Sequence, residues 1–354
     1  MAGEERRMRI LLVGAGAVGQ AYGRHLQLGG ARVSFLVRAH YAEACRAGLT
    51  LYPLNRPKAT RWQPVPFAGF GVLTRTDEVA TDTWDQVWLC ISSPALQGPW
   101  LDAFLKAIGN TTLVFLQPGL RDRDVILERW PAERLVHGLI TLISYQAPLP
   151  GERVPHPGVA YLFPPLTATP FTGPPDRTQA VVNALRAGGC RAKVSPHVRK
   201  QAALASAVLL PHVVALETAG WSLPALRTSP LLTLAARASH EAMMIAATYT
   251  GFPPPAVRHV VQPLLTRLVL RLVPRVPAEN TPLVKGTPDV AVASRARSSG
   301  ASVPHVPLAL ARRGGLCRGP LRPLLGAWES PPLGGREPPR PAAAPGLAPL
   351  ALQG

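Results

Sequence analysis

The chain has 354 residues, of which 47% are hydrophobic, enough to form the cores of two domains of ordinary size. Its formal net charge is +18, and only five of the 38 basic residues are lysines. The arginines are scattered and are not interleaved with aromatic residues, so we expect mostly solvated positive charge and no nucleic-acid surface, with an anionic ligand as the alternative reading.

Cysteine spacing and the apolar stretches bear on the cellular compartment. The four cysteines stand far apart without a CxxC pair, and histidines such as His137 show no metal-ligand spacing, so we expect no metal site and a reducing cytoplasm. These histidines are expected to be exposed or hydrogen-bonded. The N-terminus carries two glutamates and too few apolar residues for a secretory signal. The longest apolar stretch, near 202–216, is interrupted by polar residues and is shorter than the roughly 20 residues of a membrane span, so no membrane association is expected.

The first predicted elements, within residues 9–40, form a strand, a glycine-rich turn and a helix, with the sequence RILLVGAGAVGQAYGRHLQLGGARVSFLVRAH. A GxGxxG motif placed between a strand and a helix is typical of dinucleotide-binding proteins. The first glycine permits the tight turn, the second lets the backbone approach a pyrophosphate, and the third lets the helix approach the sheet. Backbone N–H groups at the helix start then face the phosphates. The predicted cofactor-binding turn consists of Gly14, Ala15, Gly16, Ala17, Val18 and Gly19.

The second predicted strand, RVSFLV, ends in Arg38 and is followed by no nearby carboxylate. Proteins that bind NAD usually offer Asp or Glu there to the ribose hydroxyls. A guanidinium instead makes charge-assisted hydrogen bonds to a 2′-phosphate, each contributing about 1.5–3 kcal/mol. The sequence therefore predicts NADPH/NADP as the cofactor.

Up to about residue 170, short apolar runs typical of buried strands continue to alternate with helical patterns. This alternation predicts an α/β fold, with a Rossmann-type parallel sheet in an NADP-binding domain over residues 1–170. Residues 49–73 are expected to add a β-hairpin or irregular strands. The predicted strands of the sheet are RILLVG, RVSFLV, QVWLCIS, TLVFLQ and RLVHGLITLIS.

The sequence changes character after the first domain. Residues 151–175 are rich in Pro and Gly and predict a linker. Residues 176–280 are expected to form a mainly helical domain for substrate binding or dimerisation, beginning with the helix TQAVVNALRAGG. Longer helical patterns follow at 199–220, 229–251 and 255–273.

Residues 287–354 are of low complexity, rich in Pro, Arg, Gly and Ala, and predict a disordered tail. Two origins stay open: a natural tail, or a shifted reading frame that replaced the final helices of the second domain. If the tail bound nucleic acid, the affinity would fall steeply with salt and disappear on truncation near residue 287.

Several motifs together resemble the ketopantoate reductase (2-dehydropantoate 2-reductase) family over residues 8–275. They are the glycine turn with its spacing to VSFLVR, the strands WDQVWLCIS and LVFLQPG, the segment HGLITLISYQAPLPGERVPHPG, and VRKQAALA in the helical region. The resemblance implies reduction of the ketone of a small 2-oxo acid by NADPH bound across the carboxyl edge of the sheet. Lys200 would be the catalytic residue that polarises the carbonyl and delivers the proton. Ser92 and Gln117, after the fourth and fifth strands, join the cofactor-binding set, and a homodimer is compatible with the helical domain.

The chain also departs from the family pattern. Ser92 stands where the family has a lysine, and Pro118 stands where it has an asparagine beside the nicotinamide. The two asparagines that follow the catalytic lysine are missing from QAALASAVLL, and Glu279 is only a compositional stand-in for the late glutamate. These departures keep an alternative open: a catalytically degenerate NADP-binding protein acting as a sensor or interaction module.

Overall fold

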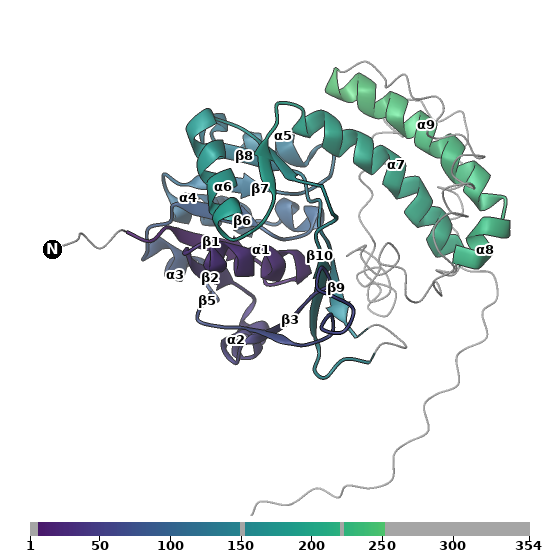
Figure 1. The fold of residues 1–354 in the computed structure, drawn as a ribbon. Coiled ribbons are helices and arrows are strands. Elements are labelled where there is room, and N and C mark those ends of the chain that lie inside the picture. Colours follow the sequence, from purple (N-terminus) through teal and green to yellow (C-terminus); the bar gives the residue numbers. More distant parts are fainter. Residues whose placement is uncertain (1–5, 149–152, 220–222, 252–354) are drawn as a thin grey trace, which may run out of the picture.

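The computed structural model describes residues 6–148, 153–219 and 223–251. The predicted helix at 255–273 and the predicted tail at 287–354 lie outside the described residues. Figure 1 shows a sheet flanked by helices, followed by two long helices that lie side by side away from that sheet. The predicted fold class, a parallel sheet followed by a helical region, is thus confirmed.

The main sheet has eight strands in the order β12-β11-β8-β7-β6-β1-β2-β5. The strands from β8 to β5 run parallel, whereas β11 is antiparallel to β8 and β12 is parallel to β11. The bounds are β1 (Arg9–Val13), β2 (Arg32–Leu36), β5 (Gly71–Leu73), β6 (Gln86–Leu89), β7 (Thr112–Phe115), β8 (Leu135–Gly138), β11 (Thr169–Thr172) and β12 (Ala192–Val194).

Both faces of this sheet are buried, which explains why its strands are continuous apolar runs. Along β1, Ile10 and Leu12 belong to one apolar cluster and Leu11 and Val13 to another, because successive side chains point to opposite faces. The first cluster includes residues of α1 (Ala17–Leu28) and α6 (Pro175–Ala187). The second includes residues of α3 (Thr76–Ala80), α4 (Trp100–Ile108) and α5 (Asp122–Leu127).

A second sheet has the order β4-β3-β10-β9, and its strands β9 and β10 contact α1. The hairpin expected within 49–73 is present as antiparallel β3 and β4, but β5 leaves it and joins the main sheet beside β2. α2 (Ala39–Arg46) connects β2 to this second sheet. The strands are β3 (Leu49–Pro53), β4 (Val65–Phe67), β9 (Ile143–Ala147) and β10 (Gly158–Leu162).

Two predictions about residues 135–187 were wrong. The run RLVHGLITLIS forms two strands in different sheets, β8 and β9, and the predicted linker contains β10 and β11. Beyond residue 170, β12 extends the main sheet and α6 packs on α1. Within residues 153–175, the prolines and glycines accompany two short strands, which the composition alone did not distinguish from a linker.

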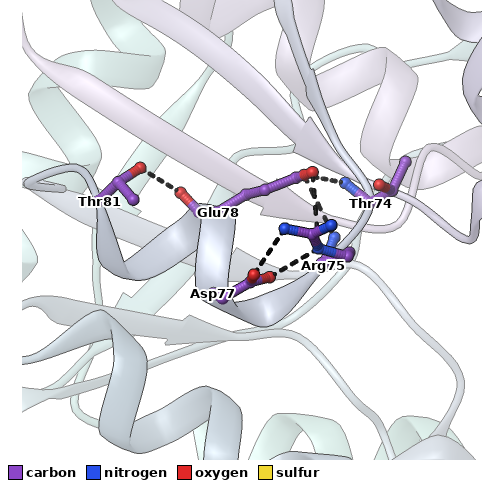
Figure 2. A network of polar contacts seen from close by, with 5 residues as sticks. All are labelled: Thr74, Arg75, Asp77, Glu78 and Thr81. Atoms are coloured by element: carbon purple, nitrogen blue, oxygen red, sulfur yellow. Dashed lines mark hydrogen bonds and ion pairs between the residues drawn. The ribbon is translucent and has the colours of Figure 1, made fainter.

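The start of α3, after edge strand β5, is held by a network of polar contacts (Figure 2). The guanidinium of Arg75 donates to both carboxylate oxygens of Asp77, at 2.9 and 2.6 Å. The Glu78 carboxylate accepts from the backbone N–H groups of Thr74 and Arg75, at 2.7 and 3.3 Å, as in a capping box. These contacts fix the helix start and keep Val79 in the core of the sheet.

The helical region consists of α7 (Val198–Thr218), α8 (Leu223–Thr228) and α9 (Leu231–Thr250). The helices predicted at 199–220 and 229–251 are therefore confirmed to within two residues. Alanines at the contact, among them Ala203, Ala207 and Ala236, let α7 and α9 pack closely. By length and composition, α7 is the one described helix that could span a membrane, and it is longer than the apolar stretch noted in the sequence.

Candidate functional site

The candidate site lies where the direction of strand succession reverses. From β1 the chain adds β2 and β5 on one side, then crosses to place β6, β7 and β8 on the other. In open α/β sheets such a reversal leaves a crevice at the carboxyl ends of the central strands. The backbone N–H of Cys90, just after β6, donates to the carbonyl of Val13 at 2.9 Å, so the two central strands end together.

The glycine turn after β1 has the close approaches that its motif predicts. Gly14 has a φ of +99°, and a Cβ there would lie 2.8 Å from the carbonyl oxygen of Cys90. A Cβ on Gly19 would lie 2.2 Å from the carbonyl oxygen of Gly14. Both positions therefore require glycine for the fold of the turn itself.

Gly16 differs from these two glycines because nothing in the described part of the chain requires it. It is exposed at the N-terminus of α1 with a φ of −73°, and a Cβ there would meet no atom within 4 Å. Its neighbours Ala15, Ala17 and Val18 are half-buried, and the Gln20 amide donates to the carbonyl of Ala15 at 2.8 Å. The first turn of α1 contains no acidic residue. A helix start of this kind favours an anion, which fits a diphosphate.

Arg38 lies close to this turn. The backbone N–H of Gly14 donates to the carbonyl of Leu36 at 2.9 Å, and Arg38 follows two residues later at the start of α2. Its side chain is exposed, and among the described residues it forms no ion pair. Arg38 therefore lies at the carboxyl end of β2, beside the glycine turn.

Gln117 and Ser92 take different positions at the ends of β7 and β6. Gln117 is buried, and its amide N–H donates to the carbonyls of Leu89 and Ile91 at 3.0 and 2.8 Å. Gln117 thus links the ends of β6 and β7, and its amide nitrogen donates to backbone carbonyls of the protein. Ser92 is exposed at the start of the short 3-10 helix η1 (Ser93–Gln97).

A small pocket lies where the sheet meets the helical region, between the end of β7, α5, the first turn of α7 and the end of α9. Gln117, Pro118 and His137 line it from the sheet side, and Arg123 and Arg199 line it from α5 and α7. The Ser206 hydroxyl of α7 donates to the carbonyl of Pro118 at 3.0 Å, which anchors α7 to the loop after β7.

His137 contradicts the expectation that the histidines are exposed or hydrogen-bonded. It is 5% exposed and stacks on Phe115 with ring centroids 4.4 Å apart. Neither ring nitrogen has a hydrogen-bond partner among the described residues. Burial, followed by the charges of Arg123 and Arg199, lowers the pKa of His137 to about 3.

Lys200 lies in the first turn of α7 and is half-buried. Arg199, Ala202 and Ala203 line the pocket, and Lys200 is not part of that lining. Successive residues of an α-helix are about 100° apart, so Lys200 lies at the side of the face that Arg199 presents to the pocket. Arg123, Arg199 and His137 were not predicted from sequence to line one pocket, because their proximity arises from long-range packing.

The buried histidine predicts a loss of stability in acid. The unfolded chain takes up a proton at His137 near pH 6.5 and the folded chain does not, so the folded state is destabilised as the pH falls below 6.5. A shift of this size predicts a loss of about 2 kcal/mol in the free energy of unfolding between pH 7 and pH 5. Urea unfolding at both pH values measures it.

The variant His137→Phe keeps the aromatic stack. Between pH 7 and pH 5 its free energy of unfolding is expected to fall by about 2 kcal/mol less than that of the wild type. Burial also lowers the pKa values of His25 and His212. These two histidines therefore add the same loss of stability in acid to the wild type and to the variant. Equal losses in the variant and the wild type would contradict the burial of an uncharged His137.

Comparisons with known proteins agree with this geometry. A family model described as ketopantoate reductase PanE/ApbA matches residues 10–156. The structure of 2-dehydropantoate 2-reductase from Geobacter metallireducens GS-15 is similar with a TM-score of 0.66 and 18% identity, covering 91% of this chain and 99% of that chain. The enzyme of that name from Methylococcus capsulatus has a TM-score of 0.59 and 17% identity, covering 91% and 96%.

D-mandelate dehydrogenase in a ternary structure with NADH and anilino(oxo)acetate is also similar, with a TM-score of 0.57 and 16% identity, covering 90% of this chain and 99% of that chain. At these identities the structural matches show a shared fold. No curated protein sequence matches this chain. No group of three or more metal-ligating side chains occurs within the part of the chain that the structure describes.

Proposed function

We propose that this protein is an NADPH-dependent reductase of a small 2-oxo acid, either 2-dehydropantoate or a related compound, because residues 10–156 match the family model of ketopantoate reductase PanE/ApbA. With 2-dehydropantoate the product is pantoate, and the role is in pantothenate biosynthesis in the cytoplasm. The observation that carries the proposal is the turn at Gly14–Gly19. Backbone oxygens leave no room for a Cβ at Gly14 or Gly19, whereas a Cβ at Gly16 would meet no atom within 4 Å.

The residues present fit a phosphorylated dinucleotide. The N–H groups at the start of α1 would hold the diphosphate, with Gly16 leaving room for the backbone to approach it. The guanidinium of Arg38 would bind the 2′-phosphate. The nicotinamide supplies the hydride that reduces the ketone.

Lys200 is the residue that we propose for the proton transfer. Its ammonium group would polarise the carbonyl and then protonate the alkoxide oxygen. The position of Lys200 in the first turn of α7, which is anchored to the loop after β7, supports this role. Gln117 positions that loop by holding the ends of β6 and β7 together.

The activity is tested by following the absorbance of NADPH with the full chain and a panel of 2-oxo acids that includes 2-dehydropantoate. Loss of NADPH that depends on both protein and acid is expected. Absence of turnover with every acid, despite measurable NADPH binding, would contradict the proposed reductase.

Replacing Arg38 with alanine is expected to weaken NADPH binding about tenfold to a hundredfold, because one or two charge-assisted hydrogen bonds to the 2′-phosphate are lost. NADH lacks that phosphate, so its affinity should change little. Fluorescence titration of the variant with both cofactors measures the ratio. The test matters because the similar D-mandelate dehydrogenase is described with NADH.

Arg46→Ala is the matched control for this experiment. Arg46 is an exposed arginine at the end of α2, the helix that Arg38 begins. This variant should retain the preference of the wild type for NADPH. An equal loss in Arg38→Ala and Arg46→Ala would assign the effect to general positive charge.

A second function is favoured by Pro118, which has no side-chain donor beside the proposed nicotinamide site, and by the absence of Lys200 from the pocket lining. Under this alternative the protein binds NADP without catalysis and acts as a sensor or interaction module. NADPH binding without turnover would support it.

A further inference from the structure

The pocket formed by Arg123, Arg199 and His137, here called the guanidinium pocket, has no assigned ligand. We propose that the guanidinium pocket is an anion subsite that binds the carboxylate of the 2-oxo acid, an inference that rests on the proposed reductase function. The two guanidinium groups would supply the charge-assisted hydrogen bonds, and the imidazole of His137 would donate one more.

The first support is the unsatisfied histidine. A buried polar group without a hydrogen-bond partner destabilises the folded state, so native proteins rarely leave one unpaired. His137 lines the pocket, is 5% exposed, and has both ring nitrogens unpartnered among the described residues. Since the imidazole is neutral at physiological pH, one of these nitrogens carries a hydrogen that a ligand oxygen can accept.

The second support is positive charge that a neighbouring carboxylate offsets only in part, since burial and Arg199 lower the pKa of Arg123 by more than Asp124 raises it. Within the described residues, neither Arg123 nor Arg199 forms an ion pair. Two acids flank Arg123 in sequence: Asp122 accepts hydrogen bonds from the Ser93 hydroxyl and the Gly119 backbone N–H, and Asp124 accepts one from the Tyr249 hydroxyl. Arg199 instead lies over the ring of Tyr249, with 5.8 Å between its guanidinium carbon and the ring centroid.

Charge and size then indicate the kind of ligand. The two arginines are half-buried and repel each other. The pKa of Arg123 is lowered, mainly by burial and secondly by the charge of Arg199. An anion between the two would remove this repulsion. The cavity encloses about 20 Å³, room for one water-sized group, so it admits an oxygen of an acid group and excludes a whole substrate.

The location matches the reaction that we propose. Pro118 and Gly119 line the same pocket at the carboxyl end of β7, beside the proposed nicotinamide site, and Lys200 lies at the side of the α7 face that carries Arg199. A 2-oxo acid carries its carboxylate on the carbon next to the ketone. A carboxylate held by Arg199 would therefore bring the adjacent ketone carbon toward the hydride donor.

The test measures binding without turnover. The full chain saturated with NADP⁺, which has no hydride to give, is titrated by calorimetry with 2-dehydropantoate and with its uncharged amide. We expect Arg199→Gln and Arg123→Gln each to raise the dissociation constant of the acid at least about tenfold, and that of the amide less than about twofold. Arg199→Lys keeps the charge without the planar fork and should show an intermediate loss.

Arg121→Gln is the matched control, since Arg121 is an exposed arginine at the start of α5 that does not line the pocket. This variant should bind the acid as the wild type does. Two results would overturn the inference. The arginine variants could bind the acid and the amide equally more weakly than the wild type does, or they could bind the acid as the wild type does because the pocket holds only water.

The proposed function is assayed in parallel and can fail separately. If the arginines control acid binding but NADPH is never consumed, the anion subsite stands and the reductase activity falls. If 2-dehydropantoate is reduced with an unchanged KM in the arginine variants, the activity stands and the subsite falls.

Discussion

The Gly16→Ala variant is expected to fold almost as stably as the wild type while binding NADPH at least about tenfold more weakly. Alanine adopts the φ of −73° at this position without strain, and its Cβ would meet no protein atom within 4 Å. The free energy of unfolding should therefore change by no more than about 1 kcal/mol. The added methyl group would instead occupy the space into which the diphosphate is proposed to fit. Urea unfolding and a cofactor titration on the same preparation separate the two effects.

Gly19→Ala is the contrasting variant. Its Cβ would lie 2.2 Å from the carbonyl oxygen of Gly14, so either α1 or the turn must move. Overpacking of this kind costs about 1–3 kcal/mol of stability, and cofactor binding should be lost with the geometry of the turn. If Gly16→Ala lost stability and Gly19→Ala did not, the assignment of one glycine to the ligand and the other to the fold would be wrong.

Replacing Lys200 with alanine is expected to lower kcat for 2-oxo acid reduction by about 10²–10⁴-fold, the usual contribution of a positioned acid or base. The affinity for NADPH should stay within about twofold of the wild type, because the proposed role of Lys200 begins at the substrate carbonyl. Steady-state kinetics with a separate cofactor titration measure both quantities.

Lys193→Ala is the control for this variant, since Lys193 is an exposed lysine on β12. It should retain full activity. An active Lys200→Ala variant, combined with loss of activity in Arg199→Gln, would transfer the polarising role to the guanidinium that lines the pocket.

The parallel core of the fold could be predicted from sequence because its signals are local. RILLVG, RVSFLV, QVWLCIS and TLVFLQ are uninterrupted apolar runs, and all four became strands buried on both faces. The glycine turn was predictable for the same reason, since its tight turn and close helix packing depend on residues within one strand-turn-helix unit.

The second sheet and the guanidinium pocket could not be predicted in this way. β3 pairs with β10 about 100 residues later, and nothing local in GVAYL distinguishes a strand of this sheet from part of a linker. Arg123, His137 and Arg199 come from α5, β8 and α7, and each alone has an ordinary sequence context. The one available signal was Arg199 directly before Lys200 at the start of a helix whose first turn contains no acidic residue.

Isothermal titration calorimetry of the full chain with NADPH and NADH tests the central claim most directly. If the turn at Gly14–Gly19 holds the diphosphate and Arg38 holds the 2′-phosphate, NADPH should bind at least about tenfold more tightly than NADH. Absence of heat with both cofactors, or tighter binding of NADH, would contradict the account.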